Sequence, residues 1–591
     1  MARSEEASPV GALDVGETGE GTGPGKKWPT PRPHDYNALK GPTEVVEGAS
    51  KGPAPEGAAA YKKYEWNDEY GDVGPRVPEL EDELFGTEFR MQVGRHMETY
   101  DRFVTTEGPV KIVPVQKWED AGLHPVIMDN IRMAGYAFPT VIQQFIMAAV
   151  NENKDVVAVS QTGSGKTAAY LIPILSRLCG KFKKLSARRP NLSAYNRTLN
   201  RARAEPLVLI VAPTRELVTQ IFDETRRFCY RTMLRPCVVY GGGSTRIQRE
   251  ELEKGCDILV ATPGRLMDFM SKPDLLSLKR VRYTILDEAD EMLDQDWAED
   301  LTKIMSGGDA NEDDDHTYLF FSATFPKEMR RAARRVMEKE YYRISVGRIG
   351  STHTNIHQDI KLVEHQDKRE ELYNLLFSMP PVRTLIFVNS KKQADLLDDY
   401  LFNKGLPSTS IHSERTQRER EDALLAFRQG TCPILVTTGV AARGLDIKNV
   451  MHVINYDLPD TDKSATGGIH EYTHRIGRTA RIGNQGRATS FYNERNADLA
   501  PALVKVLLEN GQTVPEFLDE FRPEGDGKPD FESDHTDSDE QPEEFVPKKS
   551  GNVGGFSGGF DDDDFAPHAK TAATPATATA PAAAFDASED W

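Results

Sequence analysis

A loop suited to phosphate binding lies in the first third of the chain. The stretch SQTGSGKT (160–167) follows the apolar run DVVAVS and precedes TAAYLIPILSRL, whose apolar residues recur at helical spacing. Between a strand and a helix N-terminus, backbone N–H groups and the helix dipole favour an anion. Lys166 can reach the β- and γ-phosphates of a nucleotide, and Thr167 can ligate Mg²⁺. The nucleotide-binding candidates are Ser160, Gln161, Thr162, Gly163, Ser164, Gly165, Lys166 and Thr167.

The first position of this loop departs from the strict phosphate-loop pattern, which has glycine where this chain has Ser160. A small residue suffices there, because Gly163 and Gly165 supply the backbone freedom that wraps the phosphates. We therefore expect that replacing Ser160 with Ala leaves nucleotide hydrolysis nearly unchanged.

An acidic strand end, the second part of a nucleotide site, lies 120 residues after the loop. In YTILDEAD (283–290), Asp287 follows an apolar strand, the position from which a carboxylate holds Mg²⁺ beside a phosphate loop. Glu288 comes next and can orient or deprotonate the attacking water. Carboxylates also suit the first turn of a helix, but the phosphate loop upstream favours the catalytic interpretation.

Two series of short apolar runs are expected to position these residues. The first is DVVAVS, LVLIVAP, CVVYGG, DILVATP, YTILDEAD and YLFFSAT; the second is TLIFVNS, STSIHSE, PILVTTG, HVINYDLP and ATSFYN. Runs that are apolar on both faces and end in polar residues are typical of parallel sheets. Two similar α/β domains in tandem account for both series. The join falls in ISVGRIGSTHTNIHQ (344–358), which is rich in Gly, Ser and Thr.

Charge is spread unevenly over the 591 residues. The net charge is −19, but residues 1–112 carry −8 and residues 511–591 carry −15, which leaves +4 for the middle. An acidic total therefore does not exclude a nucleic-acid partner. The five cysteines have no metal-ligand spacing and indicate thiols in a reducing compartment. We expect no transmembrane helix and no secretory signal, because no apolar run has the required length.

From DEAD (287–290) outward, residues 78–510 resemble the DEAD-box RNA helicases. The family's motifs occur in the family's order: GYAFPTVIQ (135–143) with Trp118 upstream, PTREL (213–217), GG (242–243), TPGR (262–265), SAT (322–324), LIFVNS (385–390), QRER (417–420), ARGLDI (442–447) and HRIGRTAR (474–481). The stretch SVGRIGST resembles the Vasa–Belle subgroup, which is cytoplasmic and tied to translation.

The resemblance implies roles for individual residues. Tyr136 stacks on adenine, Gln143 bonds the polar edge of the base, and Asp446 holds the ribose of ATP; packing in a turn is the alternative for Tyr136 and Gln143. Arg478 and Arg481 act as arginine fingers on the γ-phosphate. The implied catalytic set is Lys166, Asp287, Glu288, Arg478 and Arg481, with Thr167 and Asp287 as the Mg²⁺ site. The implied coupling residues are Ser322, Thr324 and His474.

The resemblance also implies an RNA surface built from strand ends and loops. Its candidate residues are Pro213, Thr214, Arg215, Gly242, Gly243, Thr262, Arg265 and Thr438. Such groups suit sugar and phosphate rather than base edges, so we expect binding that is insensitive to RNA sequence. The insert KFKKLSARRPNLSAYNRTLNRAR (181–203) contains no acid. It is either an auxiliary grip on RNA or a disordered surface loop with incidental charge.

Several positions depart from the family pattern. Ala480 replaces the usual Gly between the arginine fingers, and it shifts them if that site needs a positive φ. Gly439 stands where Ala or Asp is common, and HSE (412–414) replaces the usual HGD. The segment DTDKSATGGIHE (460–471) is longer than its counterpart in the family, and the acidic C-terminal tail lacks Arg-Gly repeats. The closing FDASEDW sets Trp591 among acids, either as a partner anchor or as a frayed terminus.

These features predict an α/β protein with two tandem RecA-like parallel-sheet domains between disordered extensions. The expected boundaries are 1–77 for a disordered extension, 78–112 for a partly ordered segment on the core, 113–346 for the first domain, 347–358 for the hinge, 359–510 for the second domain and 511–591 for an acidic low-complexity tail.

The implied function is an RNA-dependent ATPase and ATP-dependent RNA helicase that uses ATP and Mg²⁺. It would open short RNA duplexes and remodel RNA–protein complexes in translation initiation or mRNA metabolism. An ATP-gated RNA clamp that recruits translation or granule proteins through its tails is the alternative. A catalytically dead scaffold is disfavoured because the catalytic residues are all present. We expect a monomer in the cytoplasm, with the nucleus as a second compartment and no membrane partner.

Overall fold

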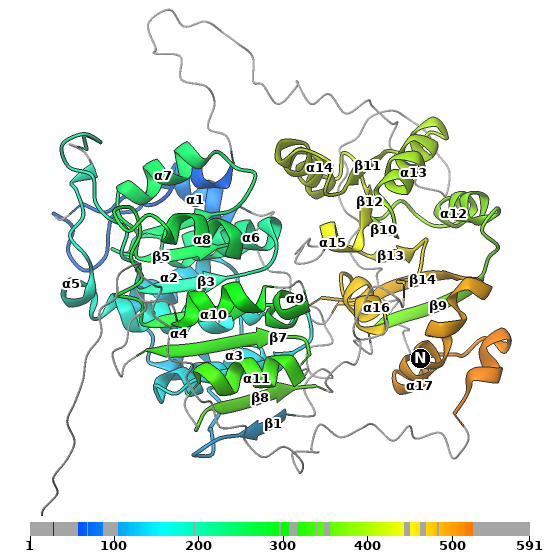
Figure 1. Cartoon of the computed structure of the whole chain (residues 1–591), viewed down its shortest axis with the longest axis horizontal. Helices are drawn as coiled ribbons and strands as arrows, with labels where there is room; N and C mark the ends of the chain where they lie inside the picture. Colours follow the sequence, from blue (N-terminus) through cyan, green and yellow to red (C-terminus); the bar gives the residue numbers. More distant parts are fainter. Residues whose placement is uncertain are drawn as a thin grey trace, which may run out of the picture. The chain divides into compact units, whose positions relative to one another are not determined.

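A computed structural model gives the structure of the chain (Figure 1). The residues that it describes are 28, 57–67, 69–86, 104–192, 195–294, 297–306, 316–324, 327–337, 340–347, 355–442, 449–460, 468–481 and 484–523. All of them lie in the first of the chain's two structural units, Met1–Pro529.

The first sheet has eight strands in the order β1-β8-β2-β7-β6-β3-β5-β4. They are β1 (Val104–Glu107), β2 (Val156–Ser160), β3 (Val208–Val211), β4 (Pro236–Val239), β5 (Ile258–Ala261), β6 (Tyr283–Asp287), β7 (Thr317–Ser322) and β8 (Tyr342–Val346). All pairs are parallel except the antiparallel pair of β1 with β8. Because β2, β7 and β6 are parallel neighbours, their carboxyl ends bring Ser160, Ser322 and Asp287 to one edge.

Helices cover both faces of this sheet (Figure 1). One face packs against α2 (Pro125–Met133), α3 (Val141–Asn151), α4 (Lys166–Cys179) and α6 (Arg215–Phe228). The other packs against α8 (Pro263–Met270), α9 (Ala289–Asp294), α10 (Ala298–Ser306) and α11 (Lys327–Val336). Successive residues of β2 alternate between the two cores: Val156 and Ala158 join the first, Val157 and Val159 the second. An uninterrupted apolar strand is therefore what this architecture requires.

The second sheet has six parallel strands in the order β11-β12-β10-β13-β14-β9. They are β9 (Ile356–Leu362), β10 (Thr384–Val388), β11 (Ser408–Ile411), β12 (Ile434–Thr438), β13 (His452–Asn455) and β14 (Gly486–Tyr492). Its helices are α12 (Lys368–Phe377), α13 (Lys391–Asn403), α14 (Gln417–Gln429), α15 (Gly439–Ala442), α16 (Ile469–Ile476) and α17 (Ala500–Glu509). Every apolar run predicted as a strand is present, which confirms two tandem RecA-like domains.

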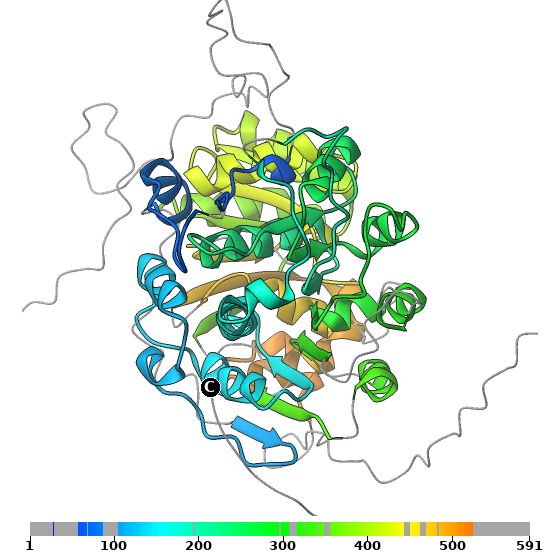
Figure 2. The same ribbon diagram turned by 90° about the vertical axis from the view of Figure 1, so that its left-hand side faces the viewer.

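The prediction of disorder up to residue 77 is wrong for the segment that we call the strap, residues 57–65. Its short helix η1 (Ala58–Ala60) buries Ala58 and Ala59 in the first domain's core. The helix α1 (Pro78–Phe85), visible in blue in Figure 2, then packs on α6 and buries Leu84. Gly- and Pro-rich composition indicated disorder, but a few buried anchors suffice to order so short a segment.

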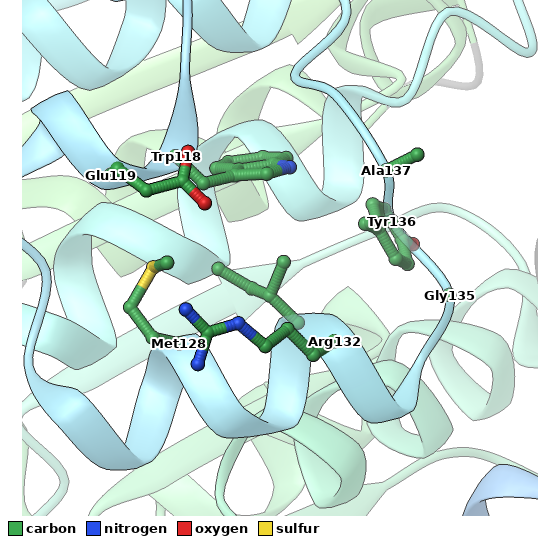
Figure 3. A pocket seen from close by; sticks show the side chains of 8 residues that line it. Trp118, Glu119, Met128, Arg132, Gly135, Tyr136 and Ala137 are labelled. Carbon is green, nitrogen blue, oxygen red and sulfur yellow. The ribbon is translucent and has the colours of Figure 1, made fainter.

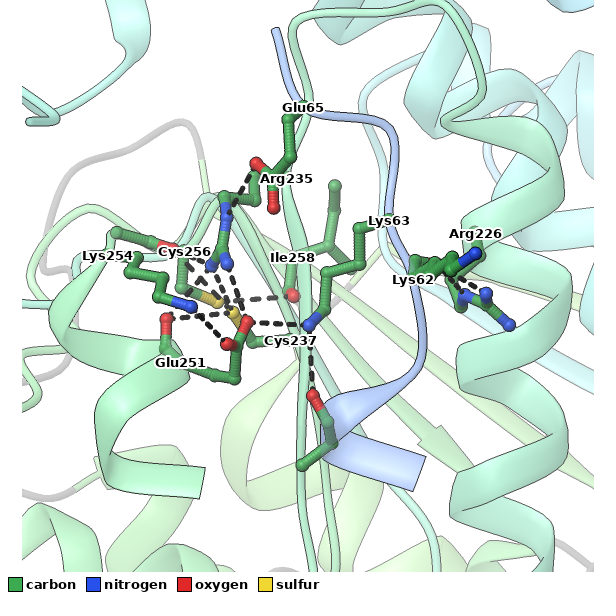
Figure 4. A network of polar contacts seen from close by, with 12 residues as sticks. Lys62, Lys63, Glu65, Arg226, Arg235, Cys237, Glu251, Lys254, Cys256 and Ile258 are labelled. Carbon is green, nitrogen blue, oxygen red and sulfur yellow. Dashed lines mark hydrogen bonds and ion pairs between the residues drawn. The ribbon is translucent and has the colours of Figure 1, made fainter. Parts of the chain in front are cut away.

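Charged groups fasten the strap at the open edge of the sheet (Figure 4). Lys63 Nζ lies 2.7 Å from the Glu251 carboxylate on α7 (Thr245–Glu253), and Arg235 Nη2 lies 2.6 Å from the same group. Burial raises the pKa of Glu251, but Lys63 and Arg235 outweigh this and lower it to about 2. The carboxylate thus stays ionised and joins the strap to the residue that precedes β4. Strand β4 is the last strand of the sheet, and the strap's helix η1 lies close to it.

Three predicted boundaries shift. Strand β1 extends the first sheet to residue 104, before the expected start at 113, and β9 begins at Ile356 inside the expected hinge. The short helix η7 (Glu516–Phe521) buries Leu518 in the second domain, so that domain extends beyond residue 510. Strand β1 alternates half-buried and exposed residues, and β9 alternates buried residues with more exposed ones, so neither has the continuous apolar pattern of a central strand.

Within the part of the chain that the structure describes, no helix is both long and apolar enough to cross a membrane.

Candidate active site

The phosphate loop has the backbone geometry that its sequence predicts. Gly163 and Gly165 have φ of 79° and 89°, a region that favours glycine, and α4 begins directly afterwards at Lys166. A Cβ on Gly165 would lie 2.7 Å from Gln143 Nε2, and one on Gly163 would lie 2.8 Å from Arg481 Cγ. Both glycines are therefore needed for their conformation and for close approach. The Lys166 ammonium is buried and donates to the Ser160 carbonyl over 3.0 Å, so the loop curls around it.

Ser160 is not a passive small residue. It ends β2, is 2% exposed, and its Oγ lies 2.9 Å from Ser164 Oγ within the loop. The hydroxyl pair ties the first position of the loop to its fifth, which a lone alanine cannot do. The expectation that the hydroxyl is dispensable did not include this bond.

The acidic strand end lies beside the phosphate loop. Asp287 ends β6, and its Oδ2 accepts a hydrogen bond of 3.0 Å from the buried hydroxyl of Tyr170 on α4. Burial raises the pKa of Asp287, while Lys166 and the Tyr170 hydroxyl act to lower it. Tyr170 is a functional candidate that sequence reasoning missed, because it is simply one apolar position in the helical pattern of α4. Its distinguishing property is a carboxylate partner 117 residues away.

Glu288 occupies a strained position next to Asp287. Its φ is 54°, unusual for a residue with a side chain, and such strain clusters at functional sites. Burial, and next the nearby Glu291 carboxylate, raise the pKa of Glu288 to about 8, although Arg478 acts to lower it. A carboxyl group with a raised pKa is suited to accept a proton near neutral pH.

The SAT residues are bonded to the helix that follows the acidic strand end. Thr324 Oγ1 donates to Asp290 Oδ2 over 2.7 Å, and the Thr324 backbone N–H bonds both Asp290 and Ser322 over 3.2 Å. Ser322 ends β7, the strand between β2 and β6. Direct hydrogen bonds therefore join Asp290, just after the acidic strand end, to Thr324, and Thr324 to Ser322.

Residues of the HRIGRTAR motif contact the first domain's site. His474 Nδ1 on α16 lies 3.3 Å from Glu291 Oε1, and Thr162 Oγ1 in the phosphate loop donates to the Gly477 carbonyl over 3.3 Å. Burial lowers the pKa of His474, but its bond to Glu291 outweighs this and raises it. The contact with Glu291 thereby favours the imidazolium form of His474 more than water does.

The two candidate arginine fingers are on the same turn. Arg478 is 4% exposed and its Nε donates to the His474 carbonyl over 3.1 Å, while the Arg481 stem lies against Gly163. Between them, Ala480 has a φ of 54° and is buried. The site does require a positive φ, and alanine bears a cost of about 1 kcal/mol there.

The region of the candidate adenine site contains a cavity of about 300 Å³ (Figure 3). It is lined by Trp118, Glu119, Met128, Ile131, Arg132, Gly135, Tyr136 and Ala137. The Tyr136 ring is half-buried, and Trp118 is 3% exposed with an indole N–H that has no hydrogen-bond partner within the described residues. Gln143 is fully buried: its Oε1 accepts from the Thr140 N–H over 2.8 Å and its Nε2 donates to the Gly165 carbonyl over 3.2 Å. It therefore ties the start of α3 to the phosphate loop, and one lone pair and one N–H remain for a base.

Two of the candidate RNA-binding loops of the first domain adjoin one another. The Arg215 guanidinium lies against Gly242, and its Nη1 lies 3.3 Å from Gln417 Oε1 on α14. Pro213 and Thr214 immediately precede it, and Thr214 caps α6. The neighbouring pair Glu216 and Arg420 forms a buried 2.7 Å ion pair, so α14 of the second domain is bound at this point.

The remaining candidates lie at the ends of other elements. Thr262 is the N-cap residue of α8, Arg265 Nη1 donates to Thr245 Oγ1 over 2.8 Å, and Thr438 ends β12. Gly243 follows Tyr240, whose hydroxyl accepts from the Ala58 N–H of the strap over 2.9 Å. The strap is thus part of the support of this loop.

Some predictions fall outside the described residues. Asp446 and most of the segment 460–471 lie outside them.

Two other features of the sequence have a structural account. The departure from the family pattern at Gly439 fits its surroundings, because a Cβ there would collide with the Glu471 carboxylate. The basic insert 181–203 is partly folded: Arg197 pairs with Glu253 over 2.6 Å and Arg189 with Asp257 over 3.0 Å. These arginines hold the insert to the domain, which contradicts a wholly disordered loop.

Asp287 and Thr167 are the residues that fit a Mg²⁺ ion bound together with a nucleotide. A buried carboxylate and a hydroxyl at the start of α4 are hard oxygen donors, as Mg²⁺ requires. Among the described residues, no group of three or more His, Cys, Asp or Glu side chains could hold a metal ion. A Mg²⁺ ion bound by Asp287 and Thr167 would take phosphate oxygens and waters as its remaining ligands.

Two parallel-sheet domains, a glycine cradle and an acidic strand end define a two-domain nucleotide-hydrolysing enzyme. A family model described as DEAD/DEAH box helicase matches residues 140–332, and one described as helicase conserved C-terminal domain matches residues 367–483. Together they cover more than half of the chain, which belongs to the DEAD-box family and is an ATP-dependent RNA helicase.

Solved structures agree with this assignment. S. cerevisiae Dbp5 bound to RNA and ADP BeF3 is 26% identical, with a TM-score of 0.56 over 68% of this chain and 95% of that chain. A double deletion of Mss116p bound to ssRNA and AMP-PNP is 26% identical, with a TM-score of 0.56 over 70% of this chain and 84% of that chain.

Proposed function

We propose that the enzyme couples ATP hydrolysis to the local opening of short RNA duplexes, through closure of its two domains on both ligands. The observation that carries this proposal is the contact of phosphate-loop and DEAD residues with the HRIGRTAR turn: Thr162 with Gly477, and Glu291 with His474. A nucleotide in the loop would reinforce these contacts, and its loss would release them. RNA opening then follows because the closed enzyme bends the RNA strand that it holds, and a bent strand no longer fits the geometry of a duplex.

Each site residue has a role in this scheme. Lys166 contacts the β- and γ-phosphates, and Thr167 and Asp287 hold Mg²⁺, which neutralises phosphate charge when bound. Glu288 orients the attacking water and accepts its proton, and Arg478 and Arg481 stabilise charge on the γ-phosphate.

Base and sugar recognition complete the nucleotide site. Tyr136 stacks on adenine, Gln143 bonds its polar edge, and Asp446 holds the ribose. Ser322, Thr324 and His474 couple the nucleotide site to RNA. The direct bond of Thr324 to Asp290 supports this role.

RNA binding is proposed to be independent of sequence and to use the candidate set named above. Backbone N–H groups, small side chains and two arginines read sugar and phosphate, which carry no base information. The insert keeps exposed cations at Lys181, Lys184, Arg188 and Arg201, which have no ion-pair partner among the described residues and can add non-specific grip. The active unit is proposed to be a monomer.

Steady-state hydrolysis tests the core of the proposal. RNA should stimulate ATP turnover, and GTP should be a poor substrate; equal use of GTP would argue against the roles of Tyr136 and Gln143. Glu288→Gln should bind ATP and RNA but hydrolyse slowly, so that the complex with RNA dissociates more slowly than wild type. Wild-type turnover in this variant would exclude Glu288 as the water-activating group.

The cellular role is proposed to lie in translation initiation or mRNA metabolism, as in the Vasa–Belle subgroup, in the cytoplasm and also in the nucleus. The tails are proposed to recruit translation or granule proteins. Deleting residues 530–591 should remove such partners while strand separation continues. Retention of every partner after this deletion would contradict recruitment by the C-terminal tail.

A further inference from the structure

A tryptophan from the N-terminal extension lies against the second domain. Trp28 is half-buried and packs on the apolar cluster that joins α12, α13 and β10. Its indole Nε1–H donates to the carbonyl of Leu376 over 3.3 Å. The two residues are 348 positions apart, so the contact belongs to the tertiary structure and not to a local turn.

The accepting carbonyl, that of Leu376, has no hydrogen-bond partner within its own helix. Leu376 is the penultimate residue of α12, and the last carbonyls of a helix have no intrahelical partner. The neighbouring Leu375 carbonyl accepts from Ser378 Oγ over 2.8 Å, whereas the Leu376 carbonyl accepts from Trp28. A tryptophan suits this place because it buries a large apolar ring and offers one N–H donor.

The surface around this contact has further apolar area. Leu362 and Phe377 are 54% and 59% exposed, and each is next in sequence to a buried member of the cluster, Val363 and Leu376. Residues that flank a docked tryptophan can therefore gain burial here.

The sequence around Trp28 resembles a linear motif. It reads GKKWPTPRP, with Lys26, Lys27 and Arg32 as its charges and a proline directly after the tryptophan. A proline disfavours helical conformation in the residue before it and lowers the entropy that an extended segment loses on binding.

We propose that the C-terminal end of α12 is a docking site for a tryptophan-proline motif, and that the chain's own motif around Trp28 occupies it. The site belongs to the second domain and is separate from the nucleotide and RNA residues. It would also accept the same type of segment from another protein when the chain's own motif is removed. The proposal does not depend on the proposed function.

Competition in the full-length chain tests occupancy. The probe is a fluorescein-labelled peptide of residues 21–35, measured by anisotropy against wild type and Trp28→Ala. The peptide should bind Trp28→Ala about tenfold more tightly, because the tethered segment competes at a high effective concentration in wild type. Trp591→Ala is the matched control and should behave like wild type. Equal affinity for all three chains, or no binding to any, would overturn the proposal.

Two further measurements fix the ligand and the location. A peptide of residues 577–591, which ends in Trp591 among acids, should bind Trp28→Ala more weakly than the 21–35 peptide; tighter binding would refute the motif assignment. A photoreactive benzoylphenylalanine at position 28 of the full chain should cross-link to residues 362–379. Cross-links confined to the first domain would refute the location. Trp28→Ala should keep wild-type basal hydrolysis and melting temperature, which excludes misfolding as the cause of any change.

Discussion

The Tyr170 hydroxyl makes an active-site contact that no sequence motif indicates, and the variant Tyr170→Phe tests whether that contact matters. Tyr170→Phe keeps the ring and its packing on Phe321, whose centroid is 4.9 Å away. It deletes the 3.0 Å bond to Asp287 and the hydroxyl's hydrogen bond with Thr167, so both proposed Mg²⁺ ligands lose this partner. A hydrogen bond to a charged group contributes about 1.5–3 kcal/mol. Asp287 also accepts from the Glu288 N–H over 3.1 Å, so the carboxylate keeps one donor and the lower end applies. About 1.5 kcal/mol corresponds to a roughly tenfold loss.

The assay is RNA-stimulated ATP hydrolysis as a function of Mg²⁺ concentration. We expect Tyr170→Phe to lower the rate about tenfold at limiting Mg²⁺ and to recover partly at saturating Mg²⁺, because Tyr170 orients a proposed Mg²⁺ ligand. The matched control is Tyr318→Phe, which removes a comparable 3.1 Å bond to the Met305 carbonyl away from the site. Wild-type Mg²⁺ dependence in Tyr170→Phe, or an equal loss in both variants, would refute the reasoning.

Three further predictions follow from single residues. Ser160→Ala strands the Ser164 hydroxyl, so the ATP concentration at half-maximal rate should rise about two- to fivefold with kcat retained; a large loss of kcat would mean that the hydroxyl acts in chemistry. Gly163→Ala places a Cβ 2.8 Å from Arg481 and at a φ of 79°, so ATP binding in a filter assay should fall at least tenfold, and normal binding would contradict the cradle. Burial lowers the pKa of His452 to about 3, below the usual 6.5, so its contribution to stability is complete above pH 6.5 and is lost as pH falls toward 3. Urea unfolding should show about 1 kcal/mol less stability at pH 5.5 than at pH 7, and His452→Asn, matched to it in hydrogen-bonding capacity, should lose this part of the pH dependence; an unchanged slope would show that His452 is not the titrating group.

Local pattern was sufficient for the central strands and for the loop after β2. Buried parallel strands such as β2 and β6 are apolar throughout, and Gly163, Gly165 and Lys166 are defined by neighbours within a few residues. The same pattern failed at the edges, since β1 and β9 are only partly covered and have no continuous apolar run. The strap was missed because its order depends on Lys63 meeting Glu251, 188 residues away.

By itself, the sequence determined which residues could bind phosphate. It also determined which parallel strands would place these residues at the same edge of the sheet, because both properties follow from spacing along the chain. Only the tertiary structure decided that Tyr170 holds Asp287, that Ala480 adopts a positive φ and that Trp28 reaches Leu376. Each of these depends on which distant groups fold against one another, and short-range periodicity carries no information about such pairings. A backbone conformation or a hydrogen-bond partner is set by the surrounding packing, and that packing exists only in the folded chain.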